Sequence, residues 1–106
     1  MTIADGYPDR MSAPDLTVHD DPEVSRFLLR RGDSIVGLAD YVLDGDVVTI
    51  PHVETAPQHR GQGFAAQLMD GIVDAVRTDG RTIRPICPYA AQYLQGRPDT
   101  HDLVVR

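Results

Sequence analysis

A glycine-rich turn directly before a long helical periodicity constrains this chain more than any other segment. It reads Gln58-His59-Arg60-Gly61-Gln62-Gly63-Phe64-Ala65. Glycine lets the backbone curl and approach a ligand without a Cβ in the way. The first amides of a helix have no intrahelical partner and carry the positive end of the helix dipole. The segment therefore predicts an anion cradle, typical of sites that bind phosphate or pyrophosphate.

The periodicity after this turn predicts a helix over residues 61–79 that Gly80 ends. One face is polar and carries Gln67, Asp70, Gly71, Asp74, Arg77 and Thr78. The other face is apolar and carries Phe64, Ala65, Leu68, Met69, Ile72, Val73 and Val76. A helix with this pattern packs its apolar face on a sheet or on another helix.

The rest of the chain favours β-strands around this helix. Strands are predicted at residues 17–19, 24–31, 34–43, 47–55, 82–87 and 103–105, and a short helix at residues 89–95. This order predicts an α+β fold: a mixed, mostly antiparallel sheet with a βαβ unit and helices packed on it. Pro51 cannot donate to a ladder, so we expect an interruption there that frees backbone groups for a ligand.

Composition limits the classes of function. With 106 residues and a formal net charge of −6, the chain is expected to form a single domain over residues 16–106, after a disordered leader at 1–15. The acidic balance argues against nucleic-acid binding and favours cationic partners such as amines. A domain of this size buries a small core, so a homodimer is compatible with it.

Other features of the sequence bear on location and metals. The lone Cys87 excludes an internal disulfide and fits a reducing compartment. The chain has neither a secretory signal nor an apolar run near the ~20 residues that cross a bilayer, so we expect a cytoplasmic protein without a membrane partner. The histidines show no paired metal-ligand spacing, and no metal site is expected.

Two known phosphate-binding patterns fit the turn poorly. The dinucleotide-binding fingerprint needs a third glycine where this chain has Ala66, and the Walker pattern needs a lysine, which this chain lacks. On the pattern alone, the turn could also simply begin a helix.

With its neighbours, the turn is similar to the signature of a known family. Gln58-x-x-Gly61-x-Gly63 resembles the Gln/Arg-x-x-Gly-x-Gly/Ala motif of the GNAT superfamily of acetyl-CoA-dependent acyltransferases. His52-Val53-Glu54-Thr55-Ala56-Pro57 and Ile86-Cys87-Pro88-Tyr89 resemble segments of the short, single-domain GNAT-like proteins that contain Cys-Pro-Tyr. The similarity spans residues 26–98. Val53 and Thr55 are exchanged relative to that pattern, and Arg97-Pro98-Asp99-Thr100 replaces its usual ending.

The resemblance implies a GNAT-like fold with acetyl-CoA (coenzyme A) as the cofactor. It implies that the pyrophosphate is held by the backbone amides of Arg60, Gly61, Gln62, Gly63, Phe64 and Ala65. It also implies that the backbone of Val53, Glu54 and Thr55 pairs with the pantetheine arm like an added strand. In this fold the strands on either side of the helix diverge and open a cleft, which agrees with Pro51.

Glu54 is the candidate general base, because many GNAT enzymes keep a base at this position. An amine must be neutral to attack a thioester, and partial burial would raise the pKa of Glu54 toward the useful range. His52 lies two positions earlier on a strand, so the two side chains share a face ~6–7 Å apart. We expect His52 to be structural or to line the substrate site. A surface or helix-capping role remains the alternative for Glu54.

Cys87 and two tyrosines follow the helix. Cys87 would act as a nucleophile only if a cation or helix N-terminus lowered the pKa of its thiol; otherwise it lines the pocket. Because GNAT enzymes often use a tyrosine of this helix to protonate the departing CoA thiolate, the resemblance makes Tyr93 the candidate acid. Tyr89 shares its helix face and would line the substrate site. Core packing is the alternative role for either tyrosine.

These observations predict an N-acetyltransferase that moves an acetyl group from acetyl-CoA to an amine of a small molecule or protein side chain, by direct attack. The alternative is a catalytically weak acyl-CoA-binding sensor or interaction module. A phosphate-binding protein for another nucleotide is a further, weaker reading.

Overall fold

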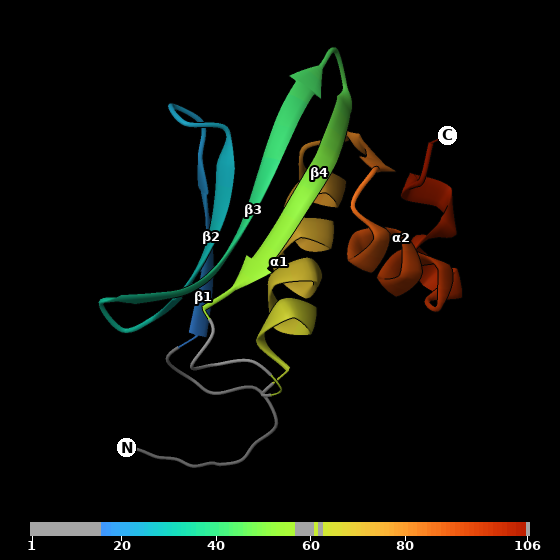
Figure 1. Ribbon diagram of the computed structural model, residues 1–106. Coiled ribbons are helices and arrows are strands. Elements are labelled where there is room, and N and C mark those ends of the chain that lie inside the picture. Colours follow the sequence, from blue (N-terminus) through green and yellow to red (C-terminus); the bar gives the residue numbers. More distant parts are fainter. Residues whose placement is uncertain (1–15, 57–60, 62, 106) are drawn as a thin grey trace.

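In the computed structural model, residues 16–56, 61 and 63–105 are described (Figure 1). Along the chain the elements are β1 (Leu16–Asp21), β2 (Arg26–Arg31), β3 (Ser34–Asp44), β4 (Val47–Thr55), α1 (Phe64–Thr78), β5 (Thr82–Pro85), α2 (Pro88–Gln95) and the 3₁₀ helix η2 (Pro98–Leu103). The expected leader, together with Gln58, Arg60 and Gln62 of the turn, lies outside the described residues.

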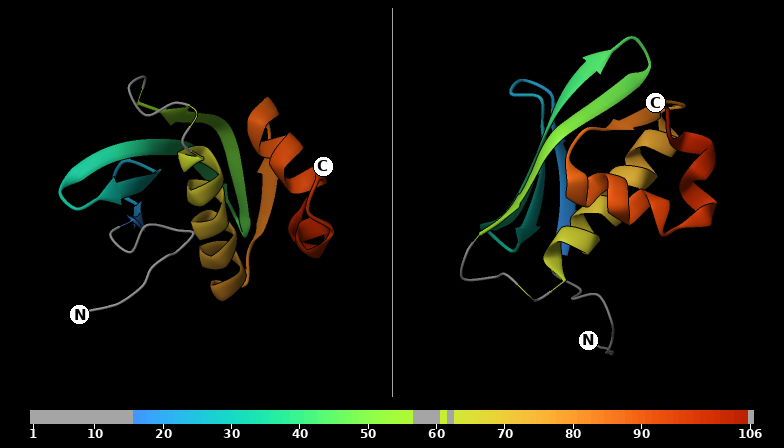
Figure 2. Two further views of the ribbon diagram at one scale, coloured as in Figure 1. Left: turned by 90° about the horizontal axis from the view of Figure 1, so that it is seen from below. Right: turned by 45° about the vertical axis from the view of Figure 1, so that its right-hand side comes forward.

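The five strands form one sheet in the order β1-β2-β3-β4-β5. The first four strands pair antiparallel, and β5 pairs parallel to β4. The α+β fold with a mixed, mostly antiparallel sheet is therefore confirmed, and β4-α1-β5 is its βαβ unit. Figure 2 shows α1 across one face of the sheet and α2 beside it, next to β5. Helix α2 contacts α1, β4 and β5.

Several boundaries differ from the sequence prediction, and three of the differences bear on the site. Helix α1 begins at Phe64 rather than at residue 61, because Gly61 and Gly63 have left-handed φ values of 80° and 77°. Strand β5 ends at Pro85, which has no amide hydrogen to continue a ladder. The predicted closing strand is reduced to a single parallel bridge between Ile83 and Val104.

The 3₁₀ helix η2, which the sequence analysis missed, precedes that bridge. Thr100 is buried within it, and the Thr100 hydroxyl donates to the carbonyls of Leu94 (3.1 Å) and Arg97 (2.8 Å). These bonds fasten the end of the chain to α2. A buried threonine with two local acceptors favours a tight turn over an extended strand.

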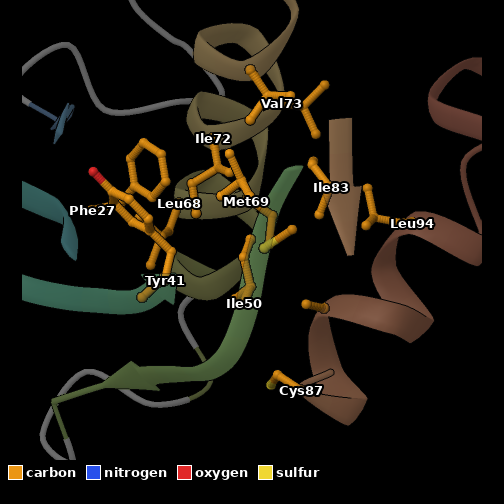
Figure 3. Close-up of a cluster of buried hydrophobic side chains, with 14 of the residues drawn as sticks. Phe27, Tyr41, Ile50, Leu68, Met69, Ile72, Val73, Ile83, Cys87 and Leu94 are labelled. Carbon is orange, nitrogen blue, oxygen red and sulfur yellow. The ribbon is translucent and has the colours of Figure 1, made fainter. Parts of the chain in front are cut away.

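The apolar face of α1 forms the centre of the core, as predicted. Its buried residues are Phe64, Leu68, Met69, Ile72, Val73 and Val76. They pack against buried side chains of the sheet and of α2, among them Ile50, Ile83 and Leu94 (Figure 3). The helix ends at Thr78, and Gly80 follows as the predicted stop with a φ of 70°. The Gly80 amide donates to Arg77 and the Arg81 amide to Val76, the hydrogen bonds of a Schellman motif.

Gly71 lies where α1 crosses β1, although its position in the helical pattern suggested a polar, solvent-facing site. A Cβ at Gly71 would lie 2.3 Å from Cγ2 and 2.6 Å from Cβ of Val18. The missing side chain therefore lets the helix approach the sheet closely. The sequence pattern cannot show this contact, because Val18 belongs to a distant strand.

We expect Gly71→Ala to lower the free energy of unfolding by about 1–2 kcal/mol. Overpacking costs ~1–3 kcal/mol, and the better helix propensity of alanine offsets ~0.5–1 kcal/mol. Chemical denaturation measures the difference. Gly96→Ala is the matched control, because Gly96 has an ordinary φ of −79° and an added Cβ meets nothing closer than 3.5 Å. A Gly71→Ala protein as stable as the parent would show that the contact relaxes freely.

The buried Tyr41 makes the stability of the fold depend on pH in the alkaline range. Burial, followed by the hydrogen bond that its hydroxyl donates to Asp20 (2.7 Å), raises the pKa of Tyr41 to about 12. An unfolded tyrosine titrates near ~10. The folded state therefore holds this proton more tightly, and the resulting stability is present below pH ~10 and lost as the pH rises through about 12. We expect Tyr41→Phe to flatten the fall in unfolding free energy between these values, measured by denaturation at each pH.

Candidate functional site

Strands β4 and β5 diverge near the middle of β4. Their parallel pairing runs from Val47↔Thr82 to Ile50↔Pro85. The Ile50 carbonyl then accepts hydrogen bonds from the amides of Ile86 (3.0 Å) and Cys87 (2.8 Å), which closes the ladder. Beyond this point β4 continues beside β3, while the chain from β5 turns into α2 (Figure 1).

A β-bulge at Ile50 and Pro51 accompanies the divergence. In the β3–β4 ladder, Asp40 pairs with His52 and Val42 pairs with Thr49, so one residue of β3 faces two residues of β4. This irregularity is the interruption that Pro51 predicted. A bulge bends its strand and shifts the alternation of side chains by one position. It therefore decides which residues of the second half of β4 face each side of the sheet.

The backbone N–H and C=O groups of Val53 and Thr55 point toward the edge of β4 that no longer pairs with β5. The Ala56 amide donates to the Val36 carbonyl of the β3 side (3.1 Å). Because N–H and C=O directions alternate along a strand, Glu54 also points its backbone toward β3, and Val53 and Thr55 point away from it. An extended ligand can bind such groups as an added strand would.

The start of α1 has the features of an anion site. The helix has Gly63 as its N-cap, and the structure shows neither a side-chain cap bond nor an acidic residue in the first turn. Gly61 and Gly63 are exposed, and a Cβ on either would meet no atom of the described residues within 4 Å. The start of α1 therefore places the positive end of the helix dipole beside two exposed glycines, a setting that stabilises an anionic ligand. Phe64 and Ala65 begin this helix.

Arg31 adds a positive charge beside this turn and was missed by the sequence analysis. Its guanidinium carbon lies 4.7 Å from the centre of the Phe64 ring. The residue ends β2, far from the turn in sequence, so only the assembled sheet brings the two together. A cation at this place favours a phosphate group at the first turn of α1.

His52 and Glu54 lie together, as their spacing predicted. His52 Nε2 and Glu54 Oε1 are 2.9 Å apart, and each side chain is 51% exposed. About half of the Glu54 side chain is therefore exposed, and its carboxylate is paired with an imidazole. Asp40 stands opposite His52 on β3, and its Oδ1 accepts a hydrogen bond from Arg26 Nε at 2.7 Å. The ionisable residues Arg26, Asp40 and His52 thus lie in a row across β2, β3 and β4.

Cys87 lies where the two strands diverge and is 7% exposed. It is the N-cap of α2, with Pro88 at the first helical position, and its amide is bonded to Ile50. Figure 3 shows its side chain at the end of the hydrophobic cluster. The burial of Cys87 favours a role in lining the site over nucleophilic attack.

The two tyrosines of α2 have different surroundings. Burial, followed by the hydrogen bond that the Tyr93 hydroxyl donates to Asp70 of α1, raises the pKa of Tyr93. The Arg97 guanidinium covers the Tyr93 ring at 4.5 Å from its centre. Tyr89 is 38% exposed, and burial followed by the negative charge of Asp70 raises its pKa. Both phenols therefore stay protonated at neutral pH, as a proton donor must.

Neither a metal site nor a membrane span is found in the part of the chain that the structure describes. No group of three or more His, Cys, Asp or Glu side chains there could hold a metal ion. None of the helices in residues 16–56 and 63–105 combines the length and the apolar character needed to cross a bilayer.

Comparison with known proteins identifies a family. The sequence model of the family described as GCN5-related N-acetyl-transferase matches residues 26–103. No curated protein matches the chain.

Solved structures share the fold at low sequence identity. A GCN5-like protein from Staphylococcus aureus superposes with a TM-score of 0.66 at 18% identity, covering 88% of this chain and 91% of that one. The ribosomal-protein-S18-alanine N-acetyltransferase of Escherichia coli has a TM-score of 0.56 at 14% identity, covering 82% of this chain and 54% of that one. The N-acetylglutamate synthase of Neisseria gonorrhoeae, in complex with coenzyme A and N-acetyl-glutamate, has a TM-score of 0.55 at 18% identity. The superposition covers 77% of this chain and 22% of that one.

Proposed function

The chain belongs to the GCN5-related N-acetyltransferase family, and on that premise we propose that it transfers an acetyl group from acetyl-CoA to an amine. The observation that carries the proposal is the divergence of β4 and β5 after Ile50, on the strand that leads to the glycine turn before α1. A thioester placed between the diverging strands has Cys87 on one side and Val53 on the other.

Two sets of backbone groups would bind the cofactor. The amides of residues 60–65, with the Arg60 side chain, would hold the pyrophosphate at the positive end of α1, and Arg31 adds a cation there. The backbone of Val53 and Thr55 would pair with the amides of the pantetheine arm. This pairing would also bring a backbone N–H near the thioester carbonyl, where it stabilises negative charge in the transition state.

Acetyl-CoA supplies an activated acetyl group. Side chains of this protein would accept the proton of the amine and donate a proton to the leaving sulfur. Glu54 would accept a proton from the attacking amine, directly or through His52, whose ring nitrogen lies 2.9 Å away. The new C–N bond forms as the C–S bond breaks, and a tyrosine of α2 would protonate the leaving sulfur. Tyr93 has a donor proton already bonded to Asp70, and Tyr89 is the more exposed of the two.

The second candidate, an acyl-CoA-binding module without efficient turnover, is favoured by the exposure of Glu54 and His52. The pKa of a base in contact with water is shifted less by its surroundings than the pKa of a buried base. Such a module would keep the cofactor contacts and lack an enclosed acceptor site.

Thiol release from acetyl-CoA in a screen of amines separates the two candidates, with CoA affinity measured in parallel by calorimetry. Acetyl transfer predicts amine-dependent release of thiol and a product heavier by one acetyl group. CoA binding without release for any amine would support the binding module. If ATP competes with CoA as strongly as unlabelled CoA does, both candidates would be contradicted, and the site would be a general nucleotide-binding site.

The direct-attack mechanism predicts a small effect of Cys87→Ala. The thiol would only line the pocket, so we expect kcat to change by less than about threefold, while a nucleophile would cost about 10³-fold or more. Single-turnover measurements with an active amine give kcat, and mass spectrometry after quenching shows whether an acetyl group is ever bound to the protein. An acetylated Cys87, lost in the variant together with activity, would contradict direct attack.

A further inference from the structure

A groove of about 710 Å³ lies between the end of β5, α2 and the chain after η2. Its walls are largely apolar, with contributions from Ile86, Leu94 and Val104. Among the residues that the structure describes, the only ionisable side chains that line it are Arg84 and His101. The chain as a whole carries a net charge of −6, so the absence of carboxylates from the described part of this lining is a local exception.

Among the residues that the structure describes, Arg84 has no carboxylate partner, unlike four other arginines. Arg26, Arg77, Arg81 and Arg97 each lie within 4 Å of an aspartate oxygen. Arg84 is half-buried, and within the described ranges its one recorded hydrogen bond is a long contact of 3.4 Å to the Thr49 hydroxyl. Partial burial of a charge without a counter-charge is costly, and a ligand carboxylate would offset that cost by charge-assisted hydrogen bonds.

Arg84 and Glu54 occupy the same face of the sheet, on either side of the point where the strands diverge. Thr49 pairs with Arg84 across the β4–β5 ladder, and the flanking Ile50 and Ile83 are buried in the core (Figure 3). Thr49 and Arg84 therefore face away from α1. The bulge shifts the alternation, so that His52 and Glu54 face the same way, with Val53 packed against the core instead.

We propose that the amine acceptor also carries a carboxylate, which Arg84 binds where it lines the groove. The inference rests on the proposed acetyl transfer and names its substrate class. Thr49, which pairs with Arg84, lies three positions before His52 on β4, about 10 Å along an extended strand, so we place the amine and the carboxylate several bonds apart rather than on one carbon. Acceptors of this class are small ω-amino carboxylates with an apolar chain.

The test compares 6-aminohexanoate with hexylamine, which has the same chain and no carboxylate. We expect 6-aminohexanoate to have the lower KM, by about tenfold or more, because a charge-assisted hydrogen bond is gained. Arg84→Gln should abolish this preference without changing CoA affinity. Arg30→Gln is the matched control: Arg30 is also half-buried, on β2 away from the groove, and the preference should persist. Ile86→Glu places a carboxylate at an exposed position of the groove and should have the same effect as Arg84→Gln.

Binding of hexanoate, followed by NMR, separates this inference from the proposed function because it requires no turnover. Hexanoate should shift the resonances of the groove in the parent protein and not in Arg84→Gln. Equal KM values for the two amines, without hexanoate binding, would overturn the inference and leave acetyl transfer intact. Hexanoate binding that Arg84→Gln abolishes, with neither amine acetylated, would support the anion site and count against acetyl transfer.

Discussion

Replacing Glu54 by glutamine is expected to lower kcat for acetyl transfer by about a hundredfold or more, the usual contribution of a general base. Glutamine keeps the size of the side chain and can still accept a hydrogen bond from His52, 2.9 Å away in the parent protein. It cannot take a proton from the amine. The Kd of CoA should not change, because the expected cofactor contacts of this segment are made by the backbone of Val53 and Thr55.

Glu23 provides the matched control, since it is the other glutamate of the chain and is exposed between β1 and β2. Glu23→Gln makes the same change of charge and should leave kcat unaltered. Single-turnover rates with an amine that the parent protein acetylates are the measurement. An unchanged rate for Glu54→Gln would show that Glu54 is not the general base. A parallel rise in Kd would instead show that Glu54 acts in binding.

Introducing a carboxylate at Ala65 is expected to have opposite effects on stability and on cofactor binding. Ala65 lies in the first turn of α1, which has no acidic residue. Ala65→Glu should stabilise the free protein by about 0.3–1 kcal/mol through the helix dipole. It should weaken CoA binding by about a hundredfold, because a like charge beside the pyrophosphate is repulsive by several kcal/mol at these distances.

Ala65→Gln separates charge from size in this experiment. It introduces a side chain of nearly the same shape without the charge, so its effect on the Kd of CoA should be much smaller. Thermal unfolding of the free proteins and calorimetric titration with CoA provide the two quantities. If Ala65→Glu binds CoA as tightly as Ala65→Gln, the pyrophosphate does not lie at the start of α1.

The sequence predicted the parts of the fold whose causes are local. The periodicity of α1, the stop at Gly80 and the interruption at Pro51 each depend on residues next to one another in the chain, and all three are observed. The start of α1 was misplaced because two glycines with left-handed φ lie inside the pattern. The 3₁₀ helix η2 was missed because it depends on the buried hydroxyl of Thr100, which no periodicity indicates.

The candidate site was predictable only in its β4 and α1 parts. Spacing alone placed His52 beside Glu54, and their contact is observed. Arg31, Asp40 and Arg84 could not be predicted, because each reaches the site through strand register rather than through sequence spacing. The degree of exposure of Glu54 could not be predicted either. It depends on which face of the sheet the bulge gives to this side chain, and that face is opposite α1.

The most direct test of the account is a titration of ¹⁵N-labelled protein with acetyl-CoA, followed by NMR. The account predicts large shifts for the amides of Val53 and Thr55, of Gly63 and Ala65 at the start of α1, and of Cys87. The amide of Ala56, which is bonded to β3, should shift less. Saturation without shifts at β4 and at the first turn of α1, or no binding at millimolar acetyl-CoA, would contradict the central claim that the cofactor lies between the diverging strands.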